Sequence, residues 1–173
     1  MIVKKILNKK IIIILGLCLF IIIIFFLLLT IINNKKRITI NKQIDILVGG
    51  YNQVIKVKSL TKDVLINEDK YIRLDMEIEI KKNVDTITSL HQFMLVNDND
   101  EEISICYHEG MIDTELPSVL PNKLVANSVT SGYLYCPMVL DISKLKIKVI
   151  SGGKIDDNNE ITYEYKDYYL DLK

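Results

Sequence analysis

The hydrophobic and polar positions of this chain divide it into an apolar N-terminal segment and a longer region of alternating residues. Residues 11–32 read IIIILGLCLFIIIIFFLLLTII and contain no charged side chain. As a helix, this segment would extend roughly 33 Å, which is enough to cross a hydrocarbon core of ~30 Å. A helix packed on a soluble core carries a polar stripe, and this segment is apolar on all sides. The pattern therefore predicts a transmembrane helix over residues 11–32.

The apolar segment differs from the other kinds of hydrophobic N-terminus. A cleaved secretory signal has about 7–15 apolar residues followed by small residues at the cleavage site. This run is longer and ends in Thr30-Ile31-Ile32-Asn33. A bacterial lipoprotein would carry a Cys after the apolar run, whereas Cys18 lies within it. We therefore expect an uncleaved signal anchor.

The basic residues on the two sides of the span are nearly balanced. The tail of residues 1–10 has no acidic residue and carries the amino terminus, and no second apolar run follows that would return the chain across a membrane. Lysine and arginine near a span favour the cytoplasmic side, while long domains translocate largely regardless of charge. We expect a single-pass membrane protein with residues 1–10 in the cytoplasm and the remainder outside the cell. The flanking basic residues are Lys4, Lys5, Lys9, Lys10, Lys35, Lys36, Arg37 and Lys42.

Residues 71–80 show the clearest β-strand pattern. One phase of this segment is entirely apolar, and the other carries Tyr71 and four charged residues. Alternation with a period of two indicates one buried and one solvated face, which is typical of antiparallel sheets. The apolar residues are Ile72, Leu74, Met76, Ile78 and Ile80.

Shorter segments of similar character predict further strands and the turns between them. No segment after residue 33 has a convincing helical period, and strands recur about every 8–14 residues. This spacing predicts an all-β fold, an immunoglobulin-like antiparallel β-sandwich over residues 53–173, after a juxtamembrane linker and first strand at 33–52. The expected strands are 38–41, 54–60, 89–96, 102–108, 124–130, 132–138, 145–150 and 161–172, with turns at 49–50, 97–100 and 151–153.

The order of these segments resembles the telokin-like immunoglobulin-fold domains of bacterial surface lipoproteins and membrane-anchored proteins. The resemblance covers roughly the last 100 residues and implies a non-enzymatic extracytoplasmic module, without transferring any functional residue. Asn122 stands where the family has Gly, Cys136 stands where it has an aromatic residue, and no lipobox Cys is present. The residues that carry it are 71–83, Phe93-Met94-Leu95, 98–105, Leu120-Pro121-Asn122, 132–138 and 145–149.

Charge and composition narrow the class of protein. From residue 33 onward the chain has 18 basic and 22 acidic residues, a net charge of −4, because the four basic residues before it have no acidic counterpart. A mildly acidic domain with dispersed lysines does not suit nucleic-acid binding. About 140 residues are enough for one domain to bury a hydrophobic core.

Cys106 and Cys136 are the two cysteines outside the span, and two states are open to them. An extracytoplasmic compartment would permit a disulfide between them. The alternating pattern instead favours two separate thiols, because Ile103, Ile105 and Tyr107 form the more apolar phase of their strand. This places Cys106 on the opposite face from the expected core.

The sequence shows no catalytic or metal-binding signature. His91 and His108 are the only histidines and lie within expected strands, and no nucleophile-elbow, zinc-protease, P-loop or C-x-x-C motif is present. The acidic stretches 97–102 and 156–159 lack the central Gly of a calcium loop, so we interpret them as hairpin tips. We expect no enzymatic activity, no catalytic, cofactor-binding or metal-binding residues, no cofactor and no small-molecule ligand.

A tyrosine cluster near the C-terminus, made of Tyr163, Tyr165, Tyr168 and Tyr169, has two interpretations: a binding face or ordinary edge-strand packing.

The favoured hypothesis for the whole chain is a membrane-anchored β-sandwich with an interaction or structural role at the bacterial cell envelope. Its expected partners are the lipid bilayer, through residues 11–32, and an envelope protein. Two alternatives stay open: a secretion or conjugation machine subunit with an α+β domain and a helix near 111–127, and a small-ligand sensor.

Overall fold

A computed structural model describes residues 16–28, 37–48, 50–81, 85–111, 115–155 and 160–173. The chain divides into two compact units, Met1–Arg37 and Ile38–Lys173. The described part of the first unit is helical over residues 16–28, and no helix among the described residues is both long and apolar enough to cross a membrane. The tail of residues 1–10 and the remainder of the expected span, 11–15 and 29–32, lie outside the described residues.

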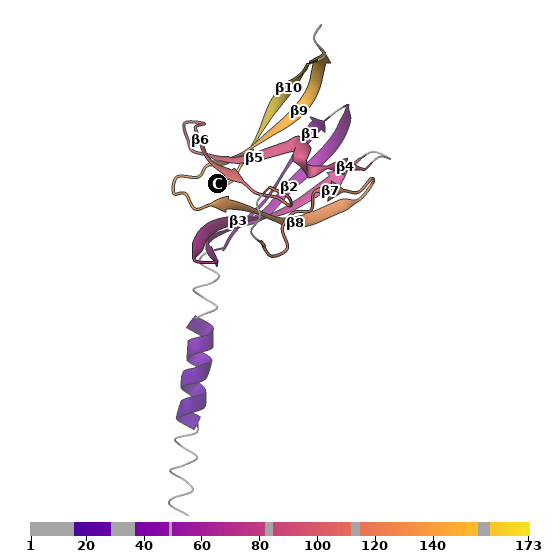
Figure 1. Cartoon of the computed structure of the whole chain (residues 1–173). Coiled ribbons are helices and arrows are strands. Elements are labelled where there is room, and N and C mark those ends of the chain that lie inside the picture. The colour runs from indigo at the N-terminus through magenta and orange to yellow at the C-terminus, as the bar shows by residue number, and fades with distance from the viewer. Residues whose placement is uncertain (1–15, 29–36, 49, 82–84, 112–114, 156–159) are drawn as a thin grey trace, which may run out of the picture. The chain divides into compact units, whose positions relative to one another are not determined.

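The second unit is an antiparallel β-sandwich of two four-stranded sheets (Figure 1). One sheet has the order β1-β2-β3-β8, the other β10-β9-β5-β6, and β4 pairs with β7 in a small third sheet. The all-β prediction is therefore confirmed, and the described part of residues 111–127 contains no helix of the kind that the α+β alternative requires. The strands are β1 Arg37–Val48, β2 Tyr51–Ile66, β3 Asp69–Ile80, β4 Thr86–Ile87, β5 His91–Val96, β6 Glu102–Cys106, β7 Lys123–Leu124, β8 Val129–Pro137, β9 Lys144–Ile155 and β10 Ile161–Asp171, with a 3₁₀ turn at Thr88–Leu90.

The core lies between the two sheets and follows the predicted alternation. All five apolar residues of the β3 phase, from Ile72 to Ile80, are 0% exposed. They face inward-pointing residues of the second sheet, such as Phe93 and Ile147, which are also fully buried. Tyr71 belongs to the polar phase but is also buried, because its ring packs edge-on against Tyr135.

The two sheets are joined covalently along one side. Backbone hydrogen bonds link Tyr107 to Tyr135 at 2.7 and 3.2 Å, and the neighbouring Cys106 and Cys136 form a buried disulfide. The prediction of two separate thiols is therefore wrong. Cys106 is fully buried in the core, whereas in the more apolar phase of β6 Ile105 is 54% exposed and Ile103 is only partly buried.

Two predictions about the C-terminal strands are also wrong. The segments 124–130 and 132–138 do not form two strands, because residues 129–137 are a single strand, β8, paired with β3 along its whole length. Residues 151–153 are not a turn. They lie inside β9, which continues to Ile155 and pairs there with Ile161.

Gly132 positions the long irregular segment that precedes β7. Residues 118–120 run beside β8, where Leu120 N donates to Tyr133 O at 2.8 Å and Tyr133 N donates to Ser118 O at 2.9 Å. A Cβ atom on Gly132 would lie 2.6 Å from the Leu120 Cα atom. The segment therefore packs against β8 because residue 132 has no side chain.

Candidate functional site

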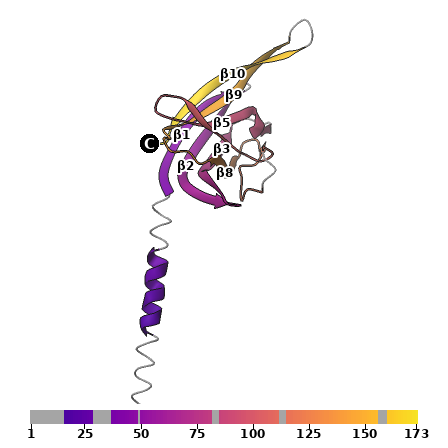
Figure 2. The same ribbon diagram turned by 60° about the vertical axis from the view of Figure 1, so that its left-hand side comes forward.

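The outer half of the β9–β10 hairpin is a two-stranded ribbon that leaves the sandwich. β9 pairs with β5 from Lys144 to Val149, but residues 150–155 pair with β10 alone. Figures 1 and 2 both show the two strands extending past the other strands. We call residues 150–155 and 161–165 the β9–β10 ribbon. Its strands lack the second packing layer that buries the rest of the sheet.

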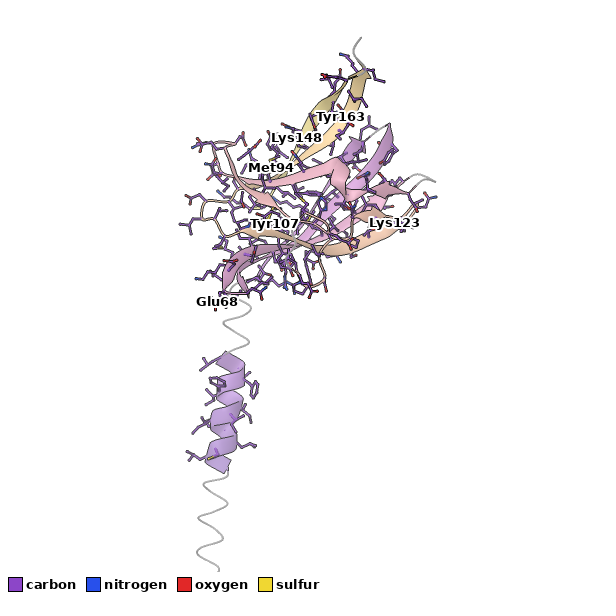
Figure 3. All side chains as sticks on the ribbon, in the orientation of Figure 1. Glu68, Met94, Tyr107, Lys123, Lys148 and Tyr163 are labelled. Atoms are coloured by element: carbon purple, nitrogen blue, oxygen red, sulfur yellow. A yellow bond between two sulfur atoms is a disulfide. The ribbon has the colours of Figure 1, made fainter. Side chains whose placement is uncertain are left out.

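Large apolar and aromatic side chains are exposed on the β9–β10 ribbon. Ile155 is 69% exposed, Ile161 55%, and Tyr163 and Tyr165 each 50%. Figure 3 shows Tyr163 on this part of the molecule, with Lys148 farther along β9. Aromatic residues grouped on an exposed surface are typical of sites that bind proteins.

The predicted tyrosine cluster is divided between two environments. Tyr163, Tyr165 and Tyr169 are exposed, whereas Tyr168 is partly buried against the core. The Tyr168 hydroxyl lies 3.1 Å from Leu47 N and 3.4 Å from Leu47 O, so it bonds the backbone of β1. The register of β10 against β9 shifts near the cluster, between Glu164 and Tyr165. Tyr168 therefore serves packing, and the other three tyrosines remain available for contact.

Lysines on the solvent face of β9 contact these tyrosines. Lys148 Nζ lies 4.7 Å from the centre of the Tyr165 ring, and Lys146 Nζ lies 5.8 Å from that of Tyr169. A cation near an aromatic face is attracted to the ring. The alternating lysines at 144, 146 and 148 are a period-two signal in the sequence. This signal places the three lysines on one face of β9, whereas their position beside the β10 tyrosines depends on how the two strands pair.

Lys146 is the most buried charge of this face. It is 9% exposed, and its Nζ contacts Asp167 at 2.7 Å and Glu102 at 2.8 Å. The hydrogen bond to Asp167, followed by that to Glu102, raises the pKa of Lys146 above its ordinary value of 10.5. This three-strand ion network holds β10 and β6 to the two sides of the β5–β9 pair.

Both histidines are buried. His91 is 1% exposed and His108 3%. His91 Nδ1 lies 3.1 Å from Thr88 O, and its Nε2 lies 2.8 Å from the side-chain oxygen of Gln53. His108 Nδ1 lies 2.9 Å from Glu109 O. Each ring therefore has at least one nitrogen within hydrogen-bond distance of a neighbouring oxygen.

The surroundings of His91 favour its neutral form. Burial lowers the pKa of His91 from 6.5 to about 4. A neutral ring donates one hydrogen bond, and Thr88 O is an acceptor that can take it. Turning the Gln53 amide then lets its Nε2 donate to His91 Nε2. That orientation gives a partner to Gln53 Nε2, which has none among the described residues.

Lysine side chains from other parts of the chain pair with the carboxylates of the acidic turn at 97–102. Asp98 contacts Lys173 Nζ at 2.6 and 2.7 Å, and Asp100 contacts Lys144 Nζ at 2.6 Å. Asn97 Oδ1 accepts from the backbone N–H groups of residues 99 and 101, which closes the turn. No group of three or more His, Cys, Asp or Glu suited to a metal is found in the described residues. The second acidic stretch, 156–159, lies outside them.

Two surface grooves accompany the sandwich. One, of about 290 Å³, is lined mainly by apolar residues, among them Ile38, Leu60 and Leu172, together with Lys62 and Lys173. The other, of about 190 Å³, lies beside Lys56 and Glu77. The first lies at the lower end of the roughly 300–1,000 Å³ of sites that enclose a small molecule, and the second lies below that range.

Comparisons with known proteins assign this chain to no family and find one similar solved structure. No family model matches the chain, and no curated protein does. The similar structure is a secreted protein of Mycobacterium tuberculosis, MPT63, at 9% identity and a TM-score of 0.49. The match covers 66% of this chain and 88% of the other. The telokin-like resemblance therefore stays an expectation.

Proposed function

We propose that this chain is a single-pass membrane protein that displays an immunoglobulin-like β-sandwich outside the cell. In this role it binds another protein of the bacterial envelope, and it catalyses no reaction. The observation that carries the interaction is the exposure of Ile155, Ile161, Tyr163 and Tyr165 on a ribbon that extends from the sandwich.

The membrane anchor is supported by the uncharged run over residues 11–32, which is long enough to cross a bilayer as a helix. The extracytoplasmic placement is supported by the disulfide between Cys106 and Cys136. Structural disulfides persist in oxidising compartments and are rare in the reducing cytosol. A single span combined with a domain outside the cell favours the orientation in which the N-terminus lies in the cytoplasm.

The interaction role is supported by the chemistry of the ribbon. Tyr163 and Tyr165 offer apolar rings with a polar tip, and tyrosine is enriched in the core of protein interfaces. The non-catalytic role is supported by the positions of His91 and His108, which are buried and bonded to main-chain or amide groups. A catalytic base must instead reach the proton it removes.

The orientation is tested by fusing alkaline phosphatase after Lys173 in the full chain. We expect an active enzyme, because it requires disulfides that form outside the cytoplasm. A matched fusion to a reporter that is active only in the cytosol should be inactive. The reverse pair of results would contradict the proposal.

The interaction is tested by a photoreactive residue at Tyr163, introduced into the full chain in its native membrane. We expect covalent adducts from this site. The control site is Lys123, whose side chain is 70% exposed on β7 (Figure 3). Adducts absent at Tyr163, or equally strong at both sites, would contradict a specific surface on the ribbon.

A further inference from the structure

The outer edge of β10 has no strand beside it in the part of the chain that the structure describes. β10 ends its sheet, and its one strand partner among the described strands is β9. The opposite side of the sandwich is closed, because β6 and β8 are joined by backbone hydrogen bonds and the disulfide. Tyr168 covers part of the open side through its contact with β1. Among the described residues, the edge of the stretch 161–167 that faces away from β9 therefore has no strand partner, and an edge of this kind is a template for another strand.

The charges of this stretch match those of a second copy of the same stretch aligned in the opposite direction. When two copies of an antiparallel strand pair about a two-fold axis at Tyr165, each Glu164 lies opposite Lys166 of the other copy. Tyr165 then faces its own counterpart, and Tyr163 faces Asp167. Opposite charges directly across a ladder stabilise it, and like charges destabilise it. Two Glu–Lys pairs therefore form at this register.

The same charges exclude the neighbouring registers. Because the side-chain period of a strand is two, the next registers that keep each face matched are centred on Glu164 and on Lys166. The first places Glu164 opposite its own copy, and the second does the same for Lys166. The ribbon thus specifies one antiparallel alignment with itself. Within its own chain Glu164 contacts Lys154 at 2.7 Å, but the Lys154 side chain is 81% exposed, and such a pair contributes little.

We propose that the partner of the β9–β10 ribbon is a second copy of this chain, paired through β10 along residues 163–167. The second sheets of the two copies then form one continuous eight-stranded sheet, in which β10 is central and its backbone is satisfied. The exposed rings of Tyr163 and Tyr165 become covered on one face. An isologous contact of this kind closes on itself and gives a dimer. The pairing rests on the proposed function only in using the ribbon as the binding surface.

Charge exchange at the paired positions tests this dimer in the full chain. Two detergent-solubilised copies with different affinity tags are mixed, and the fraction that is isolated together is measured over a range of concentrations. Glu164→Lys and Lys166→Glu, each alone, place like charges at both pairs. We expect each to weaken self-association at least about tenfold. Lys123→Glu has the same change in charge as Lys166→Glu, lies on β7, and should leave association unchanged.

Two further measurements restore the pairing of opposite charges and decide between the outcomes. In a mixture of the Glu164→Lys chain with the Lys166→Glu chain, every pair is again between opposite charges, so we expect association near the original level between the two variants and not within either. The double variant Glu164→Lys/Lys166→Glu should self-associate like the original chain. Single variants that associate normally, a mixture that shows no recovery, or an original chain that is monomeric would overturn the inference.

The photocrosslinks at Tyr163 distinguish this inference from the proposed function. Adducts of twice the mass of the chain support the self-pairing. Adducts with a different protein alone would overturn the self-pairing and leave the proposed interaction role standing. A phosphatase fusion that is inactive would instead contradict the proposed function while the tag experiment still measures the dimer.

Discussion

His91 is a residue whose protonation should control stability at acid pH. Its pKa is about 4 in the folded protein because of burial, against an ordinary value of 6.5. The unfolded chain therefore binds more protons between these values, and the free energy of unfolding falls as pH drops from 6.5 to 4. The expected loss is about 3 kcal/mol. It is measured by urea unfolding at pH 7, 5.5 and 4.

The matched variant for this effect is His91→Phe, which keeps a flat ring beside Phe93 and does not titrate. We expect it to be less stable than the original at pH 7, because Gln53 loses its partner. Its stability should change less between pH 6.5 and 4. Equal pH dependence in the two proteins would show that His91 is not the group responsible.

Gly132 is a second residue at which a substitution should lower stability, because there is no room for an added Cβ atom. Its added Cβ would meet Leu120 Cα at 2.6 Å, so Gly132→Ala must displace the 118–120 segment. We expect a loss of about 1–3 kcal/mol in thermal or urea unfolding. In Gly153→Ala the new Cβ would have its nearest neighbour at 3.6 Å, and this strand glycine should tolerate the change. Equal effects at both sites would contradict the close packing.

Residue-level reasoning from sequence succeeded where one face was uniformly apolar and failed where it was not. The phase from Ile72 to Ile80 is entirely aliphatic, so its burial could be predicted. On β6 the buried position is Cys106, and its phase continues with Ser104, which is partly buried, and with His108 just beyond the strand; all three are polar or weakly apolar by themselves. The disulfide makes that face part of the core, and its partner strand is distant in sequence. Local alternation could not reveal it.

At the scale of elements, the β6–β8 disulfide should be the strongest link between the sheets. It closes a loop across a sequence separation of 30. Replacing Cys106 and Cys136 together by Ala should lower the unfolding free energy by about 3–4 kcal/mol, mainly through the greater freedom of the unfolded chain. Urea unfolding of the full chain in detergent measures this loss. An unchanged midpoint would mean that the two thiols are not joined.

The errors in element boundaries have related causes. Gly152 and Gly153 predicted a turn because glycine ends most strands, yet both lie in the ribbon of β9, where pairing with β10 continues to Ile155. The expected strands 124–130 and 132–138 were separated at residue 131, yet residues 129–137 form one strand. There Gly132 admits the backbone of Leu120. In both places a tertiary contact, invisible in the local sequence, decided what glycine does.

At the scale of the whole molecule, the sequence predicted the division into an apolar N-terminal segment and an all-β region. The compact β unit begins at Ile38, and β1 belongs to it. The candidate surface was foreseen in part, since the tyrosines were identified. Its free edge and its extension beyond the sandwich depend on which strands pair. That pairing follows from long-range packing and could not be derived from spacing.

The most direct test of the account is the state of the three cysteines in the chain isolated from its own cells. Alkylation under denaturing conditions without reductant, followed by mass spectrometry, counts free thiols. We expect one alkylated residue, Cys18, before reduction and three after it, because Cys106 and Cys136 are joined. Three alkylated cysteines before reduction would contradict both the joined sheets and the oxidising compartment.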